Sequence, residues 1–228
     1  MTAVENLPWT RLSVEAAAIV GSILLAFAID AWWEERLDRQ MERGDLESLH
    51  TEFIRNRGRM NEMQTAGKAE AASAALYGLL ADHLGEDLPV DVPNLTIKSA
   101  RATPTFDAVT PVLDGLIQSG RLENIRDGGV LLAVHNWQRH LQQVQETELD
   151  ARKLVLEQLI PVLVRRGNMG PSFTDGDPDG VTTLTVDEEL LGHVAFRVNY
   201  TNFVVRTLKE LEQATNDVIV AVEQALAE

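Results

Sequence analysis

The hydrophobic and polar positions divide this chain into one strongly apolar helix near its start and several amphipathic helices after it. Glu15 and Asp30 are the only charged residues between positions 12 and 33, and the stretch 16–29 carries no charge. A helix needs roughly 20 mostly apolar residues to cross the hydrocarbon core of a bilayer. We therefore predict a single transmembrane helix over residues 12–33.

Tryptophans flank this apolar segment on both sides. Trp9 precedes it, and Trp32 and Trp33 close it. Indole rings are enriched at the two membrane–water interfaces, whereas a buried helix of a globular protein has no reason to carry tryptophan at both ends. The three tryptophans are predicted to be interface anchors.

Two other interpretations of the segment stay open. Ala26-Phe27-Ala28 has the small-residue pattern of a signal-peptide cleavage site. Against cleavage, Arg11 is the only basic side chain before the run, Glu15 lies next to it, and no turn-forming residue follows Ala28. The third interpretation is a core or interfacial helix of a water-soluble protein.

Small and acidic residues share one face of the predicted span. At about 100° per residue, Glu15, Ala18, Ser22, Ala26 and Asp30 fall on the same side. Small residues at four-residue spacing let two helices approach closely in lipid, and carboxyl groups avoid lipid by facing a partner. This face predicts self-association. The alternative is that the two acids mark the two membrane interfaces and reach into the headgroups.

The residues after the span read as amphipathic helix, with a break in the middle of the chain. Helical character continues to about residue 84, and its charges fit a solvated face. Prolines and polar residues then interrupt every period over residues 85–104, which predicts a linker with a short extended segment at 95–97. The apolar stripe of the first helix comprises Leu37, Met41, Leu46, Leu49, Phe53, Met60 and Met63.

Three helices are predicted in the second half. Thr103 and Pro104 resemble an N-cap followed by proline at the first helical position, with that helix ending near Ser119. A long helix is predicted over 129–166, kinked by Pro161 near its end. The last helix begins with a capping box formed by Thr185 and Glu188. The apolar stripe of the long helix comprises Val134, Trp137, Leu141, Val144, Ala151, Val155 and Val162. That of the last helix comprises Val194, Val198, Thr201, Val205, Leu208, Thr215, Ile219, Val222 and Leu226.

These patterns predict an all-α protein in which the transmembrane helix is followed by an antiparallel bundle of about four long helices. Such a bundle buries all of the amphipathic stripes at once. The predicted organisation is a tail (1–11), the transmembrane helix (12–33), a post-membrane helical segment (34–84), a linker (85–104), helical bundle (105–166), an acidic loop (167–186) and a C-terminal bundle helix (187–228).

Three stretches carry a resemblance to a known family: "VEAAAIVGSILLAFAIDAWWEE", "LESLHTEFIRN" and "TFDAVTPVLDGLIQSGRLENIRD". The first matches in spacing the G-E-I-x-L-V-x-I-G-I-L-I-A-L-x-I-N-N-W-N-E segment of a large family of uncharacterised bacterial membrane-anchored proteins. The other two resemble that family's L-x-x-L-x-x-E-F-x-x-N and S-F-D-x-L-x-x-S-G-x-L-x-x-I segments, the last with an insertion in this chain. The resemblance implies a single-pass anchor in the bacterial inner membrane and a helical body, with no implied activity.

Membrane orientation follows from two signals that disagree. The family has a basic N-terminal tail, which favours an extracytoplasmic body, whereas this tail holds a single arginine, Arg11. The nearby Arg36, Arg39 and Arg43 would favour a cytoplasmic body. We expect the extracytoplasmic orientation that the family pattern implies.

Charge and cysteine content remove several function classes. The chain has 35 acidic and 20 basic residues, which argues against nucleic-acid binding and against an electrostatic hold on anionic lipid. It has no cysteine, so disulfides, cysteine nucleophiles and thiolate metal sites are excluded.

One loop resembles a metal site. Asp175, Asp177, Asp179 and then Gly180 match the first half of an EF-hand calcium loop, in which alternate carboxylates converge on the ion. The second half fails, because Val186 occupies the position that requires a bidentate glutamate. Calcium is thus a weak candidate, and an acidic turn is the commoner explanation.

No other cofactor or catalytic group is predicted. His135 and His140 are five residues apart, so on one helix they point in different directions and do not chelate one ion. No nucleophile elbow or glycine-rich phosphate loop occurs.

The sequence favours a non-enzymatic, membrane-anchored interaction or scaffold protein. Its partners would be the lipid bilayer, a second copy of the chain and another protein of unknown identity. One alternative is an oligomeric sensor or an ion- or proton-transport component that uses Glu15 and Asp30. Another is a body that binds calcium through the loop at 175–180, or an enzymatic body with no assigned site.

Overall fold

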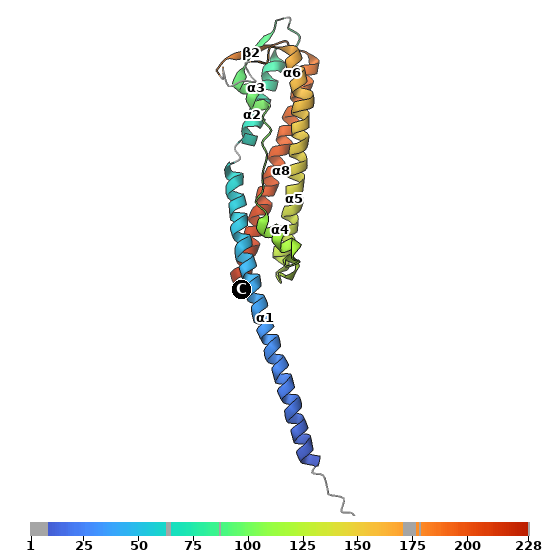
Figure 1. Ribbon diagram of the computed structural model, residues 1–228. Helices are drawn as coiled ribbons and strands as arrows, with labels where there is room; N and C mark the ends of the chain where they lie inside the picture. The colour runs from blue at the N-terminus through green and yellow to red at the C-terminus, as the bar shows by residue number, and fades with distance from the viewer. Residues whose placement is uncertain (1–8, 63–64, 87, 171–176, 178, 228) are drawn as a thin grey trace, which may run out of the picture. The chain divides into compact units, whose positions relative to one another are not determined.

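The computed structural model describes residues 9–62, 65–86, 88–170, 177 and 179–227 (Figure 1). Apart from a two-stranded sheet, the described elements are helical, which confirms the all-helical fold class with its long N-terminal helix and helical bundle. In chain order they are α1 (Trp9–Glu62), α2 (Thr65–Asp82), β1 (Val90–Pro93), α3 (Asn94–Ala100), α4 (Pro111–Gln118), η1 (Leu122–Asn124), α5 (Gly128–Lys153), η2 (Leu154–Leu159), α6 (Ile160–Arg166), β2 (Val181–Leu184) and α8 (Glu188–Ala227).

The chain divides into two compact units, residues 1–47 and 48–228. The first unit is the N-terminal part of α1. Its predicted stripe residues Leu37 and Met41 are exposed. Within the second unit, Leu49 and Phe53 of the same stripe are fully buried. Leu46, near the end of the first unit, is also buried, Met60 is half-buried, and Met63 lies outside the described residues. The predicted stripe is therefore buried from Leu46 to Phe53 and exposed at Leu37 and Met41.

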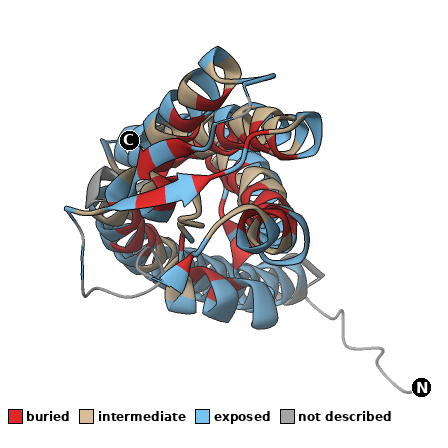
Figure 2. Cartoon of the chain, turned by 90° about the horizontal axis from the view of Figure 1, so that it is seen from above, coloured by how far each residue is buried: buried red, intermediate tan, exposed pale blue. Residues whose placement is uncertain are grey.

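The centre of the second unit is the antiparallel pair α5 and α8, which lie side by side along their length (Figure 1). Trp137 of α5 is 1% exposed, and its Nε1 donates to Thr215 Oγ1 of α8 at 3.0 Å. Its ring packs edge-on against Phe53 of α1, with centroids 4.8 Å apart. Six of the seven predicted stripe residues of the long helix are buried, Leu141 being half-buried. Seen end-on, buried residues lie on the sides of these helices that face inward (Figure 2).

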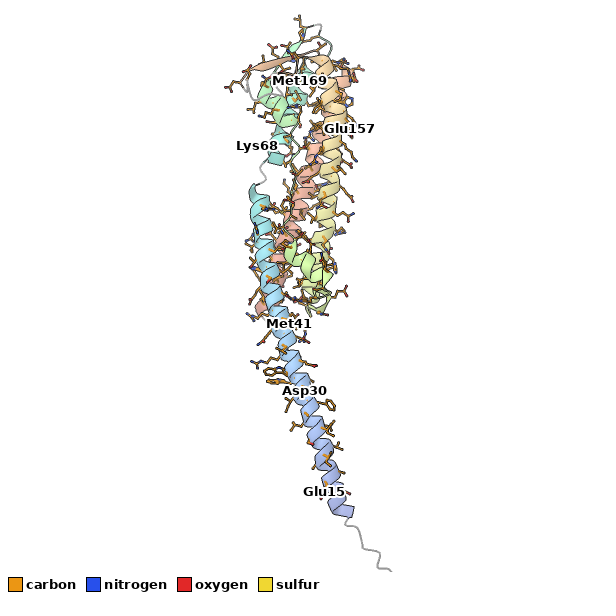
Figure 3. The ribbon with its side chains drawn as sticks, in the orientation of Figure 1. Glu15, Asp30, Met41, Lys68, Glu157 and Met169 are labelled. Atoms are coloured by element: carbon orange, nitrogen blue, oxygen red, sulfur yellow. The ribbon has the colours of Figure 1, made fainter. Side chains whose placement is uncertain are left out.

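A small sheet closes one end of this bundle. β1 pairs with β2 in antiparallel register, with Val90 opposite Leu184 and Pro93 opposite Val181. Val90 and Leu184 point into a hydrophobic cluster that also holds Leu159 and Met169; Met169 lies beside the sheet in Figure 3. The alternating burial of both strands is what one covered face of a sheet requires.

Part of the predicted linker is regular structure. Residues 95–97, expected to be extended, are helical and belong to α3, while the strand lies just before them. Asn94, at the junction, is 2% exposed: its Nδ2 donates to the Asp177 carbonyl and its Oδ1 accepts from Thr182 Oγ1. This bonding to the β2 side of the chain fixes the strand-to-helix turn, and sequence periodicity carries no sign of it.

Two predicted helix starts are wrong. Residues 102–110 are neither helix nor strand, so Thr103 and Pro104 do not begin a helix; α4 begins at Pro111. The last helix is capped by Asp187, whose Oδ1 accepts from the Leu190 amide at 2.8 Å, and not by Thr185. Asp187 also lies against Arg166, which the sequence pattern does not associate with it.

Proline in the long helix is accommodated by a change of helical pitch. Residues Leu154–Leu159, which end two residues before Pro161, form π-helix, and the Ile160 amide donates to the Val155 carbonyl, five residues back. Proline lacks an amide hydrogen and its ring crowds the preceding turn, so a wider turn relieves the clash. The helix therefore continues through Pro161 as α6.

The buried face of α8 differs from the predicted one in its middle. Val198, Val205 and Leu208 of the predicted stripe are only half-buried, whereas Arg197, which is not part of it, is buried. Thr201 is buried, as predicted. The Thr201 hydroxyl donates to the Arg197 carbonyl one turn earlier, which lets a polar residue face the core without an unsatisfied group. Threonines 207 and 215 are buried in the same way.

Candidate functional site

The apolar N-terminal segment is one uninterrupted helix whose side chains lie outside any core. Ile19, Leu24 and Phe27 are 61%, 63% and 66% exposed, and no residue of the most apolar 18-residue window is buried within the described part of the chain. The helix is long and apolar enough to cross a membrane. It continues through Ala28 without a break, as the sequence predicted.

Aromatic and charged side chains cluster where the apolar segment ends. The rings of Trp32 and Trp33 lie with centroids 6.1 Å apart, and the Arg36 guanidinium lies 5.7 Å from the Trp32 centroid. Arg39 pairs with Glu35 one turn away at 2.5 Å. This apolar-to-charged transition is typical of a membrane interface. Trp9 is the first described residue of α1, and its side chain lies outside the described part of the structure.

The small and acidic face is wholly helical. Glu15, Ala18, Ser22, Ala26 and Asp30 all lie in α1, with the two acids near opposite ends of the segment (Figure 3). Ser22 Oγ donates to the Ile19 carbonyl at 2.8 Å, so the hydroxyl is satisfied by its own helix. Ser22 therefore adds little polar cost in lipid, and the role of the whole face in self-association stays a prediction.

A second site lies inside the bundle, around a segment that we call the strap, residues 102–110. Its backbone bonds to side chains from α1. Asn56, fully buried, donates from Nδ2 to the Val109 carbonyl and accepts at Oδ1 from the Val109 amide, both at 2.8 Å. Arg59 donates to the Asp107 carbonyl at 2.6 Å. The side chains of α1 thus replace the neighbouring strand that an extended segment would otherwise need.

Glu52 extends this arrangement to the start of α4. Its two carboxylate oxygens accept from the amides of Val112 and Leu113 at 2.7 and 3.0 Å. These amides belong to the first turn of α4, whose own N-cap residue, Thr110, makes no side-chain cap. Burial raises the pKa of Glu52, while the two amide donors lower it. A carboxylate from α1 therefore caps α4 across the bundle.

Two further buried side chains, from α5 and α8, bond to the backbone of the strap and of the end of α3. Glu148 of α5 accepts from the Phe106 amide at 2.7 Å, and Arg197 of α8 donates to the carbonyls of Ala100 and Ala102 at 2.9 and 2.6 Å. Burial lowers the pKa of Arg197 to about 10. In the sequence Glu148 looks like a polar interruption of its helix and Arg197 does not stand out, because a buried charge on a helix has no periodic signature.

Residues from two of the three stretches that carried the family resemblance meet here. "LESLHTEFIRN" contributes Glu52, Phe53 and Asn56, and "TFDAVTPVLDGL" contributes the bonded backbone from Phe106 to Leu113. These residues have a structural role, since every one of these groups bonds to protein backbone or packs in the core.

We expect Glu148→Gln to stabilise the protein at alkaline pH. Burial raises the pKa of Glu148 from 4.5 to about 7, against smaller lowering effects of the Phe106 amide and Arg152. A raised pKa means that the folded state holds the proton more tightly than the unfolded state. The stability that protonated Glu148 contributes to the wild type is therefore complete below pH 4.5 and is lost as pH rises through 7. Glutamine keeps the acceptor for Phe106 without the buried charge. Urea unfolding at pH 8 should give the variant up to about 3 kcal/mol more stability.

The control for this prediction is the same measurement at pH 5. Wild-type Glu148 is then protonated in the folded state, so the difference between the two proteins should be small. An equal difference at pH 5 and pH 8 would show that the buried charge has no part in it.

The acidic loop lies only partly within the described residues. Asp175 is outside them; Asp177 and Asp179 are inside them. The Asp177 backbone carbonyl accepts from Asn94, and its carboxylate lies over Gly180, where an added Cβ would collide with it. Among the described residues no three His, Cys, Asp or Glu side chains are grouped to hold a metal ion. The calcium interpretation gains no support from Asp177 and Asp179.

The two histidines of α5 have different neighbours. His135 Nδ1 lies 3.3 Å from Gln138 Oε1, whereas His140 Nδ1 lies 4.0 Å from Glu210 Oε2 of α8. They do not form a common site.

Comparison of the chain with models of protein families, with curated proteins and with solved structures finds no match.

Proposed function

We propose that this protein is a membrane-anchored, non-enzymatic helical module that binds other proteins, including copies of itself. The observation that carries the proposal is the apolar segment of α1, in which no residue of the most apolar window is buried among the described residues. Burying its large side chains in lipid would gain about 25 cal/mol for each Å² removed from water. A water-exposed run of this length would otherwise aggregate.

The bundle supports the second half of this proposal. Its buried polar groups, Glu52, Asn56, Glu148 and Arg197, bind backbone and fix the path of the strap between the helices. A rigid helical surface displayed on an anchor suits the recognition of another protein. The acidic and small-residue face of the anchor provides the surface for self-association in lipid.

The direct test is fractionation of bacteria that express the full chain, followed by an alkaline carbonate wash. The proposal predicts full-length protein in the washed membranes, with its body cleaved by protease added from outside the inner membrane. Full-length protein in the soluble fraction would refute the anchor. Recovery of a chain that begins after Ala28 would identify a cleaved signal peptide instead.

A further inference from the structure

The part of α1 that directly follows the apolar segment exposes apolar side chains. We call this part, residues 33–44, the neck. Trp33, Leu37 and Met41 are 56%, 44% and 55% exposed, whereas Leu46 is 4% exposed. Leu46 follows Leu37 by nine residues, which places it about 180° further round the helix. The described chain therefore covers α1 on the Leu46 side and leaves the opposite side, at Leu37, exposed.

The residues on this exposed side recur at the spacing of a paired helix. Trp33, Leu37 and Gly44 are separated by four and then seven residues, as seam positions of a left-handed helix pair are, with Gln40 as a polar seam position between them. A Cβ added at Gly44 would meet no atom within 4 Å, so packing within the described chain does not require glycine there. Glycine weakens the interior of a helix but lets a second backbone approach closely. Its place on the Leu37 side fits contact with another helix.

The same side of α1 continues into the apolar segment. Ala26 and Asp30 precede Leu37 by 11 and 7 residues, which places both within about 20° of it round the helix. Both belong to the small and acidic face that is predicted to contact another helix in lipid. The helix has no break between these residues and Leu37. A partner helix that follows this face out of the membrane therefore reaches the neck.

Charged residues of opposite sign flank the exposed side of the neck. Arg36 and Arg43 lie on one flank, and Glu34 and Asp38 lie on the other. Glu47 also falls on the arginine flank, where it pairs with Arg43 at 3.2 Å. In a parallel pair of identical helices related by a two-fold axis, each flank of one helix faces the other flank of its partner. Two copies of this chain therefore place arginine beside acid along both flanks.

We propose that the neck binds the neck of a second copy of this chain, in parallel and with the same residues opposite each other. A shared anchor gives both copies the same direction, and confinement to one membrane raises their effective concentration. A contact of this length then suffices, although it is too small to hold two soluble proteins together. This inference rests on the proposed anchor and names where, outside the bilayer, self-association occurs.

Disulfide trapping in washed membranes tests the contact, because the full-length chain has no cysteine of its own. Leu37→Cys is compared with Arg39→Cys, a position about 160° away round the helix whose side chain is 64% exposed. Oxidation with copper–phenanthroline is followed by gel electrophoresis without reductant. A cross-linked species of twice the chain mass should form at least tenfold faster for Leu37→Cys than for Arg39→Cys.

Charge reversal in the Leu37→Cys protein tests the flanks. A copy with Arg36→Glu and Arg43→Glu has two acidic flanks, and a copy with Glu34→Arg and Asp38→Arg has two basic flanks. Cross-linking should slow at least fivefold between copies that carry the same reversal. It should recover between an acidic and a basic copy, and tags of different size identify this mixed dimer.

Three results would overturn the inference. The first is an equal rate for Leu37→Cys and Arg39→Cys. The second is a main product whose mass differs from twice that of the chain, which would assign the neck to another protein. The third is a mixed pair of reversed copies that cross-links no faster than like pairs.

None of these results bears on the anchor, because the chain is oxidised only after recovery in washed membranes. Recovery of the full-length chain in the soluble fraction would refute the proposed function instead. The same two oxidation rates, measured on that soluble chain, would then decide the neck contact separately.

Discussion

Leu24→Arg combined with Leu25→Arg is expected to remove the protein from carbonate-washed membranes. Both leucines are 63% exposed and lie near the middle of the apolar segment. An arginine at the centre of a membrane helix costs about 2.5–3.5 kcal/mol on insertion scales, and each lost leucine also removes a favourable contribution. The combined cost exceeds the margin expected of a span that already carries two acids. Immunoblots of washed membranes and soluble fractions give the measurement.

The matched control places the same charges beyond the predicted span. Gln40→Arg combined with Met41→Arg adds two arginines where Met41 is 55% exposed and where charged residues already alternate. This variant should remain in the membrane like the wild type. Equal retention of both double variants would mean that the segment around Leu24 is not in lipid.

Trp137→Ala is expected to destabilise the bundle by about 3–5 kcal/mol, the usual range for deleting a large buried aromatic side chain. Trp137 is 1% exposed, contacts Phe53 edge-on and donates to Thr215. Its loss leaves a cavity between three helices. Circular dichroism at 222 nm during urea unfolding measures the effect, with a lower midpoint and a similar slope expected.

Two control variants show whether the loss of stability in Trp137→Ala comes from the buried contacts of the side chain. Leu132→Ala lies on the same helix, but Leu132 is 64% exposed, so its effect should be within about 0.5 kcal/mol. Thr215→Val removes the acceptor of the indole N–H and should cost about 1–3 kcal/mol, because it leaves a buried donor unsatisfied. A Trp137→Ala effect no larger than that of Leu132→Ala would contradict the assigned core.

Helices with a continuous apolar stripe could be predicted from the sequence. The α5 stripe is buried almost as predicted, because Val134, Trp137 and Val144 recur at a spacing that has no second interpretation. The uninterrupted apolar helix at the start of α1 was equally clear from its composition. In both helices the apolar side chains are so numerous and so regularly placed that no polar contact is needed to explain the helix.

The strap and the middle of α8 could not be predicted, because side-chain hydrogen bonds determine them. Asn56 and Glu52 look like solvated positions of a charged helix, yet they satisfy backbone groups 53 and 60 residues away in sequence. Arg197 faces inward because the carbonyls of Ala100 and Ala102 lie there. Such pairings are specified by tertiary structure, and single-sequence periodicity contains no trace of them. The small sheet could not be predicted either, because each strand has only four residues, too few for a clear alternating pattern.

The most direct measurement of lipid residence is thiol labelling, which the cysteine-free chain permits without background. Leu24→Cys and Met41→Cys proteins are treated in isolated membranes with a membrane-impermeant maleimide, from each side and after detergent. A helix that resides in lipid predicts that the thiol at position 24 stays unlabelled from both sides until detergent is added, while the thiol at position 41 reacts from one side. Labelling of position 24 as fast as position 41 in intact membranes would contradict it.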